Sequence, residues 1–140
     1  MKKEENKTKI SKVSKASKVS KESREKDTKT IDAAGMTLGR VATAAAMHLM
    51  GKTRATFERH AYSGFPVKIL NASKISITPK KLETITHKRH SGIPGGLRIM
   101  TAGETAVKKG MKELVRLATY QMLPGNKLRR IMMKNLKIEN

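Results

Sequence analysis

The chain contains no cysteine and no tryptophan among its 140 residues. Without thiols, a disulfide scaffold, a thiolate zinc site and thiol redox chemistry are all excluded. The lack of cysteine is also compatible with a reducing compartment. We therefore look for a function that needs neither disulfides nor thiolate metal ligands.

Aromatic side chains are also scarce, at 3% of the chain: only Phe57, Tyr62, Phe65 and Tyr120 are present. Alanine, methionine, leucine and isoleucine must therefore build most of the interior. Few aromatics also argue against stacking on single-stranded bases, because that mode of binding depends on aromatic platforms. If the partner is RNA, we expect recognition of shape and backbone in folded RNA.

Long hydrophobic runs are missing as well. No apolar run approaches the roughly 18 residues of a membrane span, and the segment that follows Met1 lacks the apolar region of a secretory signal. Five acids within the first 27 residues argue against a transit peptide, which would be poor in acids. We expect a cytoplasmic protein with no membrane partner.

Acidic residues are few: 11 Asp and Glu stand against 31 Lys and Arg, which gives a formal net charge of +20. Residues 1–30 carry eleven basic residues against five acids, and residues 31–140 carry twenty against six. So many like charges on a small body repel one another unless a polyanion neutralises them. The body itself, and not only its amino-terminal end, is therefore expected to bind a nucleic acid.

A low-complexity segment opens the chain. Between Ser11 and Arg24 the unit Ser-Lys-x, or Ser-Arg at its end, repeats in a three-residue register. Too few apolar groups are present to offset an ordering cost of about 1 to 2 kcal/mol per residue. We predict a disordered basic arm over residues 1–29, which either orders along phosphates or serves only as a solvated tail; the two readings carry equal weight.

From residue 30 to residue 140 we expect one α/β domain. Residues 30–33, 67–71, 75–78 and 84–90 are extended by pattern, and Pro79 is expected to stop the third of these runs. Apolar spacing predicts one helix between Thr37 and Gly51, with Thr37 as N-cap and Gly51 as a left-handed C-cap. It predicts a second helix through residues 111–122 and a short one over 126–135, before Leu136-Lys137-Ile138. This alternation favours a three-layer α/β body.

Motifs of enzymes and cofactor sites are not supported. Gly51-Lys52-Thr53 resembles the end of a phosphate-binding loop, but Ala46 stands where that motif needs glycine, and the residues follow a helix. His87 and His90 have no third ligand at a suitable spacing, and cationic neighbours would repel a metal ion. No paired carboxylates or activated nucleophile can be found. We expect no enzyme activity, no cofactor, no metal and no small-molecule substrate.

Two segments are better candidates for contact with RNA. The loop Gly92-Ile93-Pro94-Gly95-Gly96 could bring its backbone amides close to a phosphate, although a simple turn keeps about a third of the weight. Near the end of the chain, basic residues are interspersed with apolar ones, and no acid stands among them. This pattern predicts a helix that packs on one face and meets phosphate on the other. These basic residues are Lys127, Arg129, Arg130, Lys134 and Lys137.

The order of several motifs resembles the bacterial type of ribosomal protein L-thirteen family, over residues 30 to 138. The first is Asp32-Ala33 followed by Thr37-Leu38-Gly39-Arg40-Val41-Ala42. The others are Leu49-Met50-Gly51-Lys52, Leu70-Asn71-Ala72 with Lys74, His90-Ser91-Gly92 with Gly95-Gly96, Met122-Leu123-Pro124, Leu128 with Arg130, and Leu136-Lys137. Each is weak alone, but together they keep the family's order and spacing.

This resemblance implies a three-layer α/β/α fold around a mainly parallel four-stranded sheet. It further implies a structural constituent of the large ribosomal subunit, which binds large-subunit rRNA early in assembly beside neighbouring ribosomal proteins. Motif positions and local charge together give the residues expected on or near rRNA. They are Arg40, Lys52, Arg54, Lys88, Arg89, His90, Gly92, Gly95, Gly96, Lys127, Arg129, Arg130 and Lys134.

The chain departs from the family pattern at several turns. Gly64-Phe65-Pro66 stands where Gly-Asp is usual, and Thr78-Pro79 stands where Thr-Gly is usual. Gln121 and Arg129 each replace a small residue near the end of the chain. Two rival functions remain open at this point: a general DNA-binding or compacting protein, which would not explain the motif order, and an RNA-modifying enzyme, for which no catalytic group is found.

Overall fold

The computed structural model describes residues 28–140. The arm predicted for residues 1–29 therefore lies outside the described residues, apart from its last two positions. Three strands form a parallel sheet in the order β1-β2-β5: β1 (Lys29–Asp32), β2 (Val67–Leu70) and β5 (Leu136–Ile138). The central strand β2 is the most apolar, and its Val67 and Ile69 are almost fully buried.

Helix α2 (Leu38–Met50) begins and ends where the sequence predicted. Gly51 takes a left-handed conformation with φ of +79° and its amide donates to the carbonyl of His48, so the predicted C-cap is confirmed. Thr37 occupies the N-cap position with extended backbone, but its hydroxyl accepts no capping hydrogen bond. The buried stripe of α2 is rich in alanine, which lets the helix approach the sheet closely.

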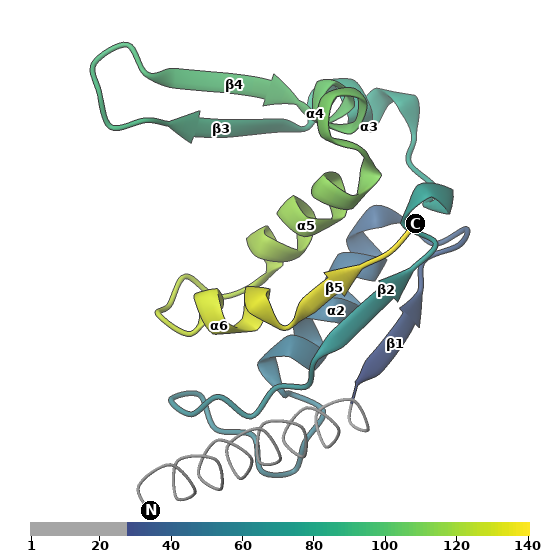
Figure 1. The fold of residues 1–140 in the computed structure, drawn as a ribbon, viewed down its shortest axis with the longest axis vertical. Coiled ribbons are helices and arrows are strands. Elements are labelled where there is room, and N and C mark those ends of the chain that lie inside the picture. Colours follow the sequence, from purple (N-terminus) through teal and green to yellow (C-terminus); the bar gives the residue numbers. More distant parts are fainter. Residues whose placement is uncertain (1–27) are drawn as a thin grey trace, which may run out of the picture.

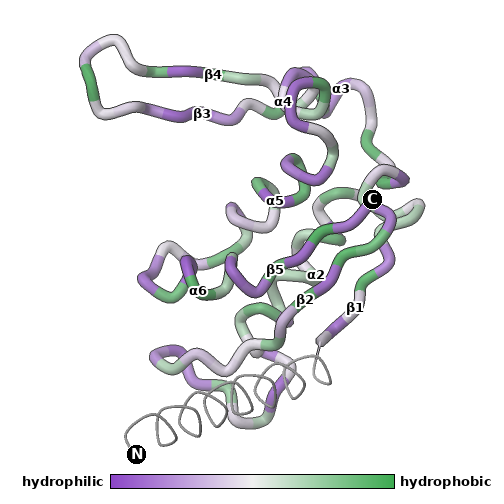
Figure 2. Tube along the Cα trace, in the orientation of Figure 1, coloured by the Kyte–Doolittle hydropathy of each residue, from purple (hydrophilic) through white to green (hydrophobic). Residues whose placement is uncertain are grey.

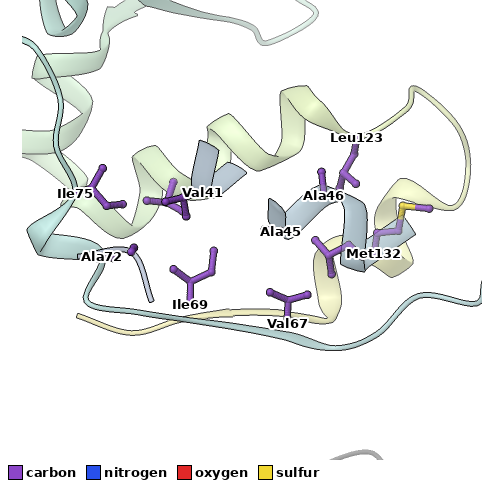
Figure 3. Close-up of a cluster of buried hydrophobic side chains, with 12 residues drawn as sticks. Val41, Ala45, Ala46, Val67, Ile69, Ala72, Ile75, Leu123 and Met132 are labelled. Carbon is purple, nitrogen blue, oxygen red and sulfur yellow. The ribbon is translucent and has the colours of Figure 1, made fainter. Parts of the chain in front are cut away.

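The core lies between the sheet and three helices (Figure 3). Val67 and Ile69 point from β2 toward α2, and Leu123 and Met132 close the same side of the core near α5 (Met111–Met122) and α6 (Arg129–Lys134). Complete burial of each such branched aliphatic side chain stabilises the fold by about 1.5 to 3 kcal/mol. Alanine, valine, leucine, isoleucine and methionine fill this interior, in agreement with the small number of aromatics.

Within residues 28–140, the helices that cover the sheet lie on one of its sides. Helices α2, α5 and α6 lie on that side (Figures 1 and 3), and α5 packs mainly on α2, so the expected arrangement with helices on both faces is not seen in residues 28–140. The other face of the sheet carries side chains that alternate with the buried ones, such as Thr30, Lys68 and Lys137. Lys68 forms an ion pair there with Glu139, with 2.9 Å between Nζ and Oε1.

The prediction of a four-stranded, mainly parallel sheet is wrong for this region. The extended stretch at 84–90 does not join the parallel sheet; it supplies β3 (Thr86–His90), which pairs antiparallel with β4 (Leu97–Thr101) in a separate hairpin. Residues 85–101 contain several basic residues and few apolar ones. Its Leu97 and Ile99 are paired with His90 and Lys88, so the segment has no continuous apolar face for a central position in a sheet, and it forms a local pair instead.

Two further predictions for the middle of the chain are corrected. Residues 75–78 form no regular strand, because only Ser76 makes a bridge, to Thr37. Pro79 does not merely stop an extended run; it opens helix α3 (Pro79–Thr84), since a proline without an N–H fits the first turn of a helix. A 3-10 turn, η1 (Ala72–Lys74), precedes these residues, and α4 (Ala102–Lys109) follows the hairpin.

A polar contact joins the carboxyl ends of β1 and β2. Asn71, at φ of 57°, donates from its side-chain amide to Asp32 Oδ1 over 2.9 Å, and the backbone amide of Ala34 donates to the same oxygen over 3.0 Å. The hydrogen bond from Asn71, then that from Ala34, hold the pKa of the Asp32 carboxyl below its ordinary value, with a smaller contribution from the charge of Lys74.

Candidate nucleic-acid interface

The β3–β4 hairpin projects away from the rest of the molecule (Figure 1). Strand β3 is hydrophilic along most of its length (Figure 2), and its Lys88, Arg89 and His90 are exposed. Strand β4 adds the exposed Arg98. Three predicted RNA-contacting residues therefore lie together on β3 and three predicted glycines lie at the tip, and Arg98 joins them although the sequence analysis did not select it.

The register of the hairpin divides its side chains between two faces. Arg89 is paired with Arg98, whereas Lys88 is paired with Ile99. Directly paired residues share a face and successive residues alternate, so the two arginines lie on one face and Lys88 on the other. Two cations in directly opposite positions destabilise a free hairpin, and such an arrangement favours a site for an anion.

The tip of the hairpin is shaped by glycine. Gly92 and Gly95 adopt φ of +92° and +76°, which side-chain-bearing residues rarely take, and a Cβ on Gly96 would lie 1.9 Å from Ser91 Oγ. The amide of Gly92 donates to His90 Nδ1 over 2.9 Å, and the amide of Gly96 donates to the carbonyl of Ile93. These two amides hold the turn, so the tip acts mainly through its shape and the side chains around it.

At the carboxyl end, the predicted basic cluster separates into two groups. Lys127, Arg130 and Lys134 are exposed on and beside α6. Arg129 instead turns inward, where its Nε donates to the carbonyl of Pro124 over 2.7 Å and its Nη2 donates to that of Leu123 over 2.9 Å. Its guanidinium also lies 4.5 Å from the centre of the Tyr120 ring. These contacts give Arg129 a role in closing the end of α5.

The predicted residues around α2 lie at its two ends. Arg40 is exposed in the first turn of the helix, and Lys52 is exposed just after its last turn. A helix of this length spans about 20 Å at 1.5 Å per residue, so the two cations are too far apart to contact one phosphate. They extend the basic surface along the body.

Phe65, one of the departures from the family pattern, has an electrostatic role. The guanidinium carbon of Arg54 lies 3.8 Å from the centre of its ring, and Lys29 Nζ lies 5.4 Å from it. Both distances fall within the range of cation–π attraction. The predicted RNA contact Arg54 is half-buried on this ring, whereas the hairpin arginines extend into solvent.

The exposed cations on the hairpin and α6 have no acidic partners in the part of the chain described here. The ion pairs found in residues 28–140 join Lys68 to Glu139, Arg116 to Glu113 and, when it is protonated, His60 to Glu58. Arg116 lowers the pKa of Glu113 through a bidentate contact on the surface of α5. The basic side chains of the hairpin are left for an external anion.

Several basic residues escaped the sequence analysis. Lys80 and Lys81 are exposed on α3, and Lys68 lies on the face of the sheet opposite α2, beside Lys137 of the predicted basic cluster. For Arg98 a signal existed, because Leu97-Arg98-Ile99 alternates in the manner of a strand. It was missed because the glycine-rich loop before it was not read as the turn of a hairpin.

Other kinds of site have less support in residues 28–140. Between the first turn of α2, α3 and α5 lies a cavity of about 600 Å³ with a largely apolar lining that includes Leu38, Ile77 and Leu114. Among residues 28–140, no three acidic or histidine side chains gather in a way that could hold a metal ion. No described helix is long and apolar enough to cross a membrane.

The fold and the charge distribution together define a class of protein: a small α/β scaffold whose exposed cations, without acidic partners within residues 28–140, are spread over a projecting hairpin, a terminal helix and the ends of α2. More particularly, the chain belongs to the family described as Ribosomal protein L13, whose model matches residues 26–138. The family expected from the order of motifs is thereby confirmed.

Curated relatives agree with this assignment. The large ribosomal subunit protein uL13 of Moorella thermoacetica is 45% identical over 108 residues, which cover 77% of this chain and 74% of the relative. The proteins of the same name from Pelobacter propionicus and Citrifermentans bemidjiense are 42% and 44% identical, each over 81% of this chain and 79% of the relative.

Proposed function

We propose that this chain is a structural constituent of the large ribosomal subunit, and that it binds and organises large-subunit rRNA. Membership of the family supports the ribosomal role, since the relatives are named as large-subunit proteins. The exposed cations on the hairpin and on α6, which lack acidic partners within residues 28–140, support contact with rRNA.

The mechanism is electrostatic and geometric. Lysine and arginine displace the counterions condensed on RNA, and a rigid body fixes the positions of RNA segments that would otherwise repel one another. If about ten phosphates are neutralised, the affinity falls with salt at a log-log slope of roughly minus seven to minus nine. The contacts are proposed at Arg40, Lys52, Lys88, Arg89, His90, Lys127, Arg130 and Lys134, with Gly92, Gly95 and Gly96 shaping the tip; Arg54 and Arg129 support the surface from within.

No chemical step is part of this function. The cations are dispersed over the surface, and no catalytic constellation was found in the sequence. We further propose that residues 30–140 act as one ribosomal domain with residues 1–29 as its basic extension. Incorporation early in assembly would place the chain beside other large-subunit proteins, which would be its protein partners.

Sedimentation of tagged chain with ribosomal particles on sucrose gradients, at low and high salt, tests this function. We expect the chain in the large-subunit fraction after a high-salt wash, because contacts buried among RNA helices exchange slowly. Release at moderate salt, or equal binding to every nucleic acid offered, would instead support the rival function of a general nucleic-acid-binding protein.

A pulse-labelling experiment tests the timing. If the chain joins early, newly made chain appears in the lightest large-subunit precursors before it appears in mature subunits. Appearance in mature subunits alone would contradict early assembly and leave the ribosomal role intact.

A further inference from the structure

Arg89 and Arg98 are two exposed like charges that the fold places at fixed positions. They come from neighbouring strands, and the register sets them directly opposite each other. In an antiparallel pair, the Cβ atoms of opposite residues lie about 4.5 to 5.5 Å apart. Neither guanidinium group makes an ion pair or a hydrogen bond within residues 28–140.

No acid lies near this pair along the hairpin. Residues 85–101 contain neither aspartate nor glutamate, while Lys88 and His90 add to the positive charge beside the arginines. The mutual repulsion of two facing guanidinium groups is therefore not relieved from within the hairpin. An anion placed between them would relieve it, because each guanidinium can donate two parallel hydrogen bonds to a phosphate.

The arginine pair also lies on a defined face of the hairpin. His87 lies on the same face of β3 as Arg89, two residues away, and is half-buried where it lines the cavity with Leu114 and Ala118 of α5. The arginine-bearing face of the hairpin is therefore the one that carries His87 at its base. An RNA strand that meets the arginines would lie against this face, farther from the body than His87.

We propose that Arg89 and Arg98 together hold one phosphodiester group of the large-subunit rRNA, on the face of the hairpin that carries His87. This inference rests on the proposed function and adds to it a single shared phosphate at a stated place. Two separate phosphates, one for each arginine, would be the arrangement of an ordinary basic surface.

Binding of in-vitro transcribed large-subunit rRNA, measured by filter retention over a series of salt concentrations, tests the inference. The variants are Arg89→Gln, Arg98→Gln and the double variant. With a shared phosphate, either arginine alone keeps the contact, so each single variant loses only about threefold in affinity, and the double variant loses more than the product of the two. The salt slope falls by about 0.7 to 0.9 in the double variant and little in the single ones.

A matched double-mutant cycle on the same hairpin serves as the control. Lys88 has a side chain on the opposite face, so the losses caused by Lys88→Gln and Arg98→Gln should multiply when they are combined. The double variant Arg89→Lys with Arg98→Lys keeps both charges but lacks the paired donors; it should bind more weakly while the salt slope stays the same. Thermal unfolding of the free variants should give melting temperatures at or above that of the unsubstituted chain, because the repulsion is removed.

Three results would overturn the inference. A fall in salt slope with each single variant would indicate two separate phosphates. Unchanged affinity in the double variant would place this face away from RNA. Lower melting temperatures of the variants would give the pair a structural role. Failure of the proposed function is distinct, because the unsubstituted chain would then show no preference for large-subunit rRNA over duplex DNA of equal length.

Discussion

In the body of the molecule, Leu49 is completely buried between the sheet and the helices, whereas in the hairpin Leu97 is 56% exposed. Apolar side chains in the body face one another, and those in the hairpin face solvent beside cations. The body holds together by burial, which needs no partner. The hairpin is two strands joined by a short loop, and such a unit is only marginally stable in water when it stands alone.

Attachment of the hairpin base to the body reduces this difference in stability. The amide of Ala102 donates to the carbonyl of Ile85 over 2.8 Å, just beyond the ends of the two strands, and Ala102 is buried. Only the outer part of the hairpin, with Arg89, Arg98 and the tip, is free of the body. The part of the molecule proposed to meet RNA is thus the part that contributes least to the core.

Replacement of the two leucines should give the largest contrast. Leu49→Ala leaves a cavity in the core and is expected to lower the free energy of unfolding by about 2 to 5 kcal/mol. Leu97→Ala should change it by less than about 0.5 kcal/mol, because the side chain is already in solvent. Urea denaturation measures both, and a loss above about 1 kcal/mol for Leu97→Ala would show that the hairpin packs on the body.

Two glycines with similar backbone angles allow the next comparison. Gly51, at φ of +79°, would bring a Cβ to 2.8 Å from Ser63 Oγ, whereas Gly95, at +76°, would meet nothing within 4 Å. We expect Gly51→Ala to destabilise the body by about 2 to 3 kcal/mol, from backbone strain and the close contact together. Gly95→Ala should cost about 1 kcal/mol from backbone strain alone. Equal melting temperatures for the two variants would contradict this account.

The neighbouring residues Arg129 and Arg130 on α6 are expected to differ in their effects on stability and on RNA binding. Arg129→Ala removes two hydrogen bonds to carbonyl groups and the contact with Tyr120, and is expected to cost about 1 to 2 kcal/mol in the free energy of unfolding. Arg130→Ala should leave stability within about 0.5 kcal/mol but weaken the binding of rRNA. A stable Arg129→Ala variant with poor RNA binding would give Arg129 the direct contact predicted from the sequence.

The smallest expected effect concerns pH. Because the pKa of Asp32 is lowered in the fold, the stability gained from its ionised form is present above the ordinary value of 3.8 and is lost as the pH falls through the lowered value. Asp32→Asn should therefore flatten the acid end of a plot of melting temperature against pH. Asn71→Gly removes the main hydrogen-bond donor at a position with φ of 57° and should produce a similar flattening. An unchanged acid limb in both variants would refute the role of this contact.

Periodic apolar residues predicted the body well. The stripe that ends at Gly51 gave α2, the β-branched run from Val67 gave β2, and the second stripe gave α5 with its bounds. In these elements local pattern and burial agree, so the sequence alone suffices. The order of motifs also led to the correct family.

The hairpin and the turns were predicted less well, because their residues are fixed by contacts distant in sequence or by solvent exposure. Strand β4 has no buried face to produce a strong alternating signal. Pro79 can end one element or begin another, and only the helix that follows decides between them. For Arg129, its charge predicted a contact with RNA, but its guanidinium donates instead to carbonyl groups at the end of α5.

The order of strands in the sheet also bears on the time course of folding. Central strand β2 pairs with β1 on one side and with β5, almost seventy residues later, on the other, as Val67 and Leu136 show. Contacts so distant along the chain form slowly, whereas a hairpin can close in about 1 to 10 μs. During synthesis and folding, the arginine-bearing hairpin can therefore form transiently before the core has closed, although it becomes stable only when its base is attached to the body. A chain that meets nascent rRNA at this stage would complete its core while it is already attached.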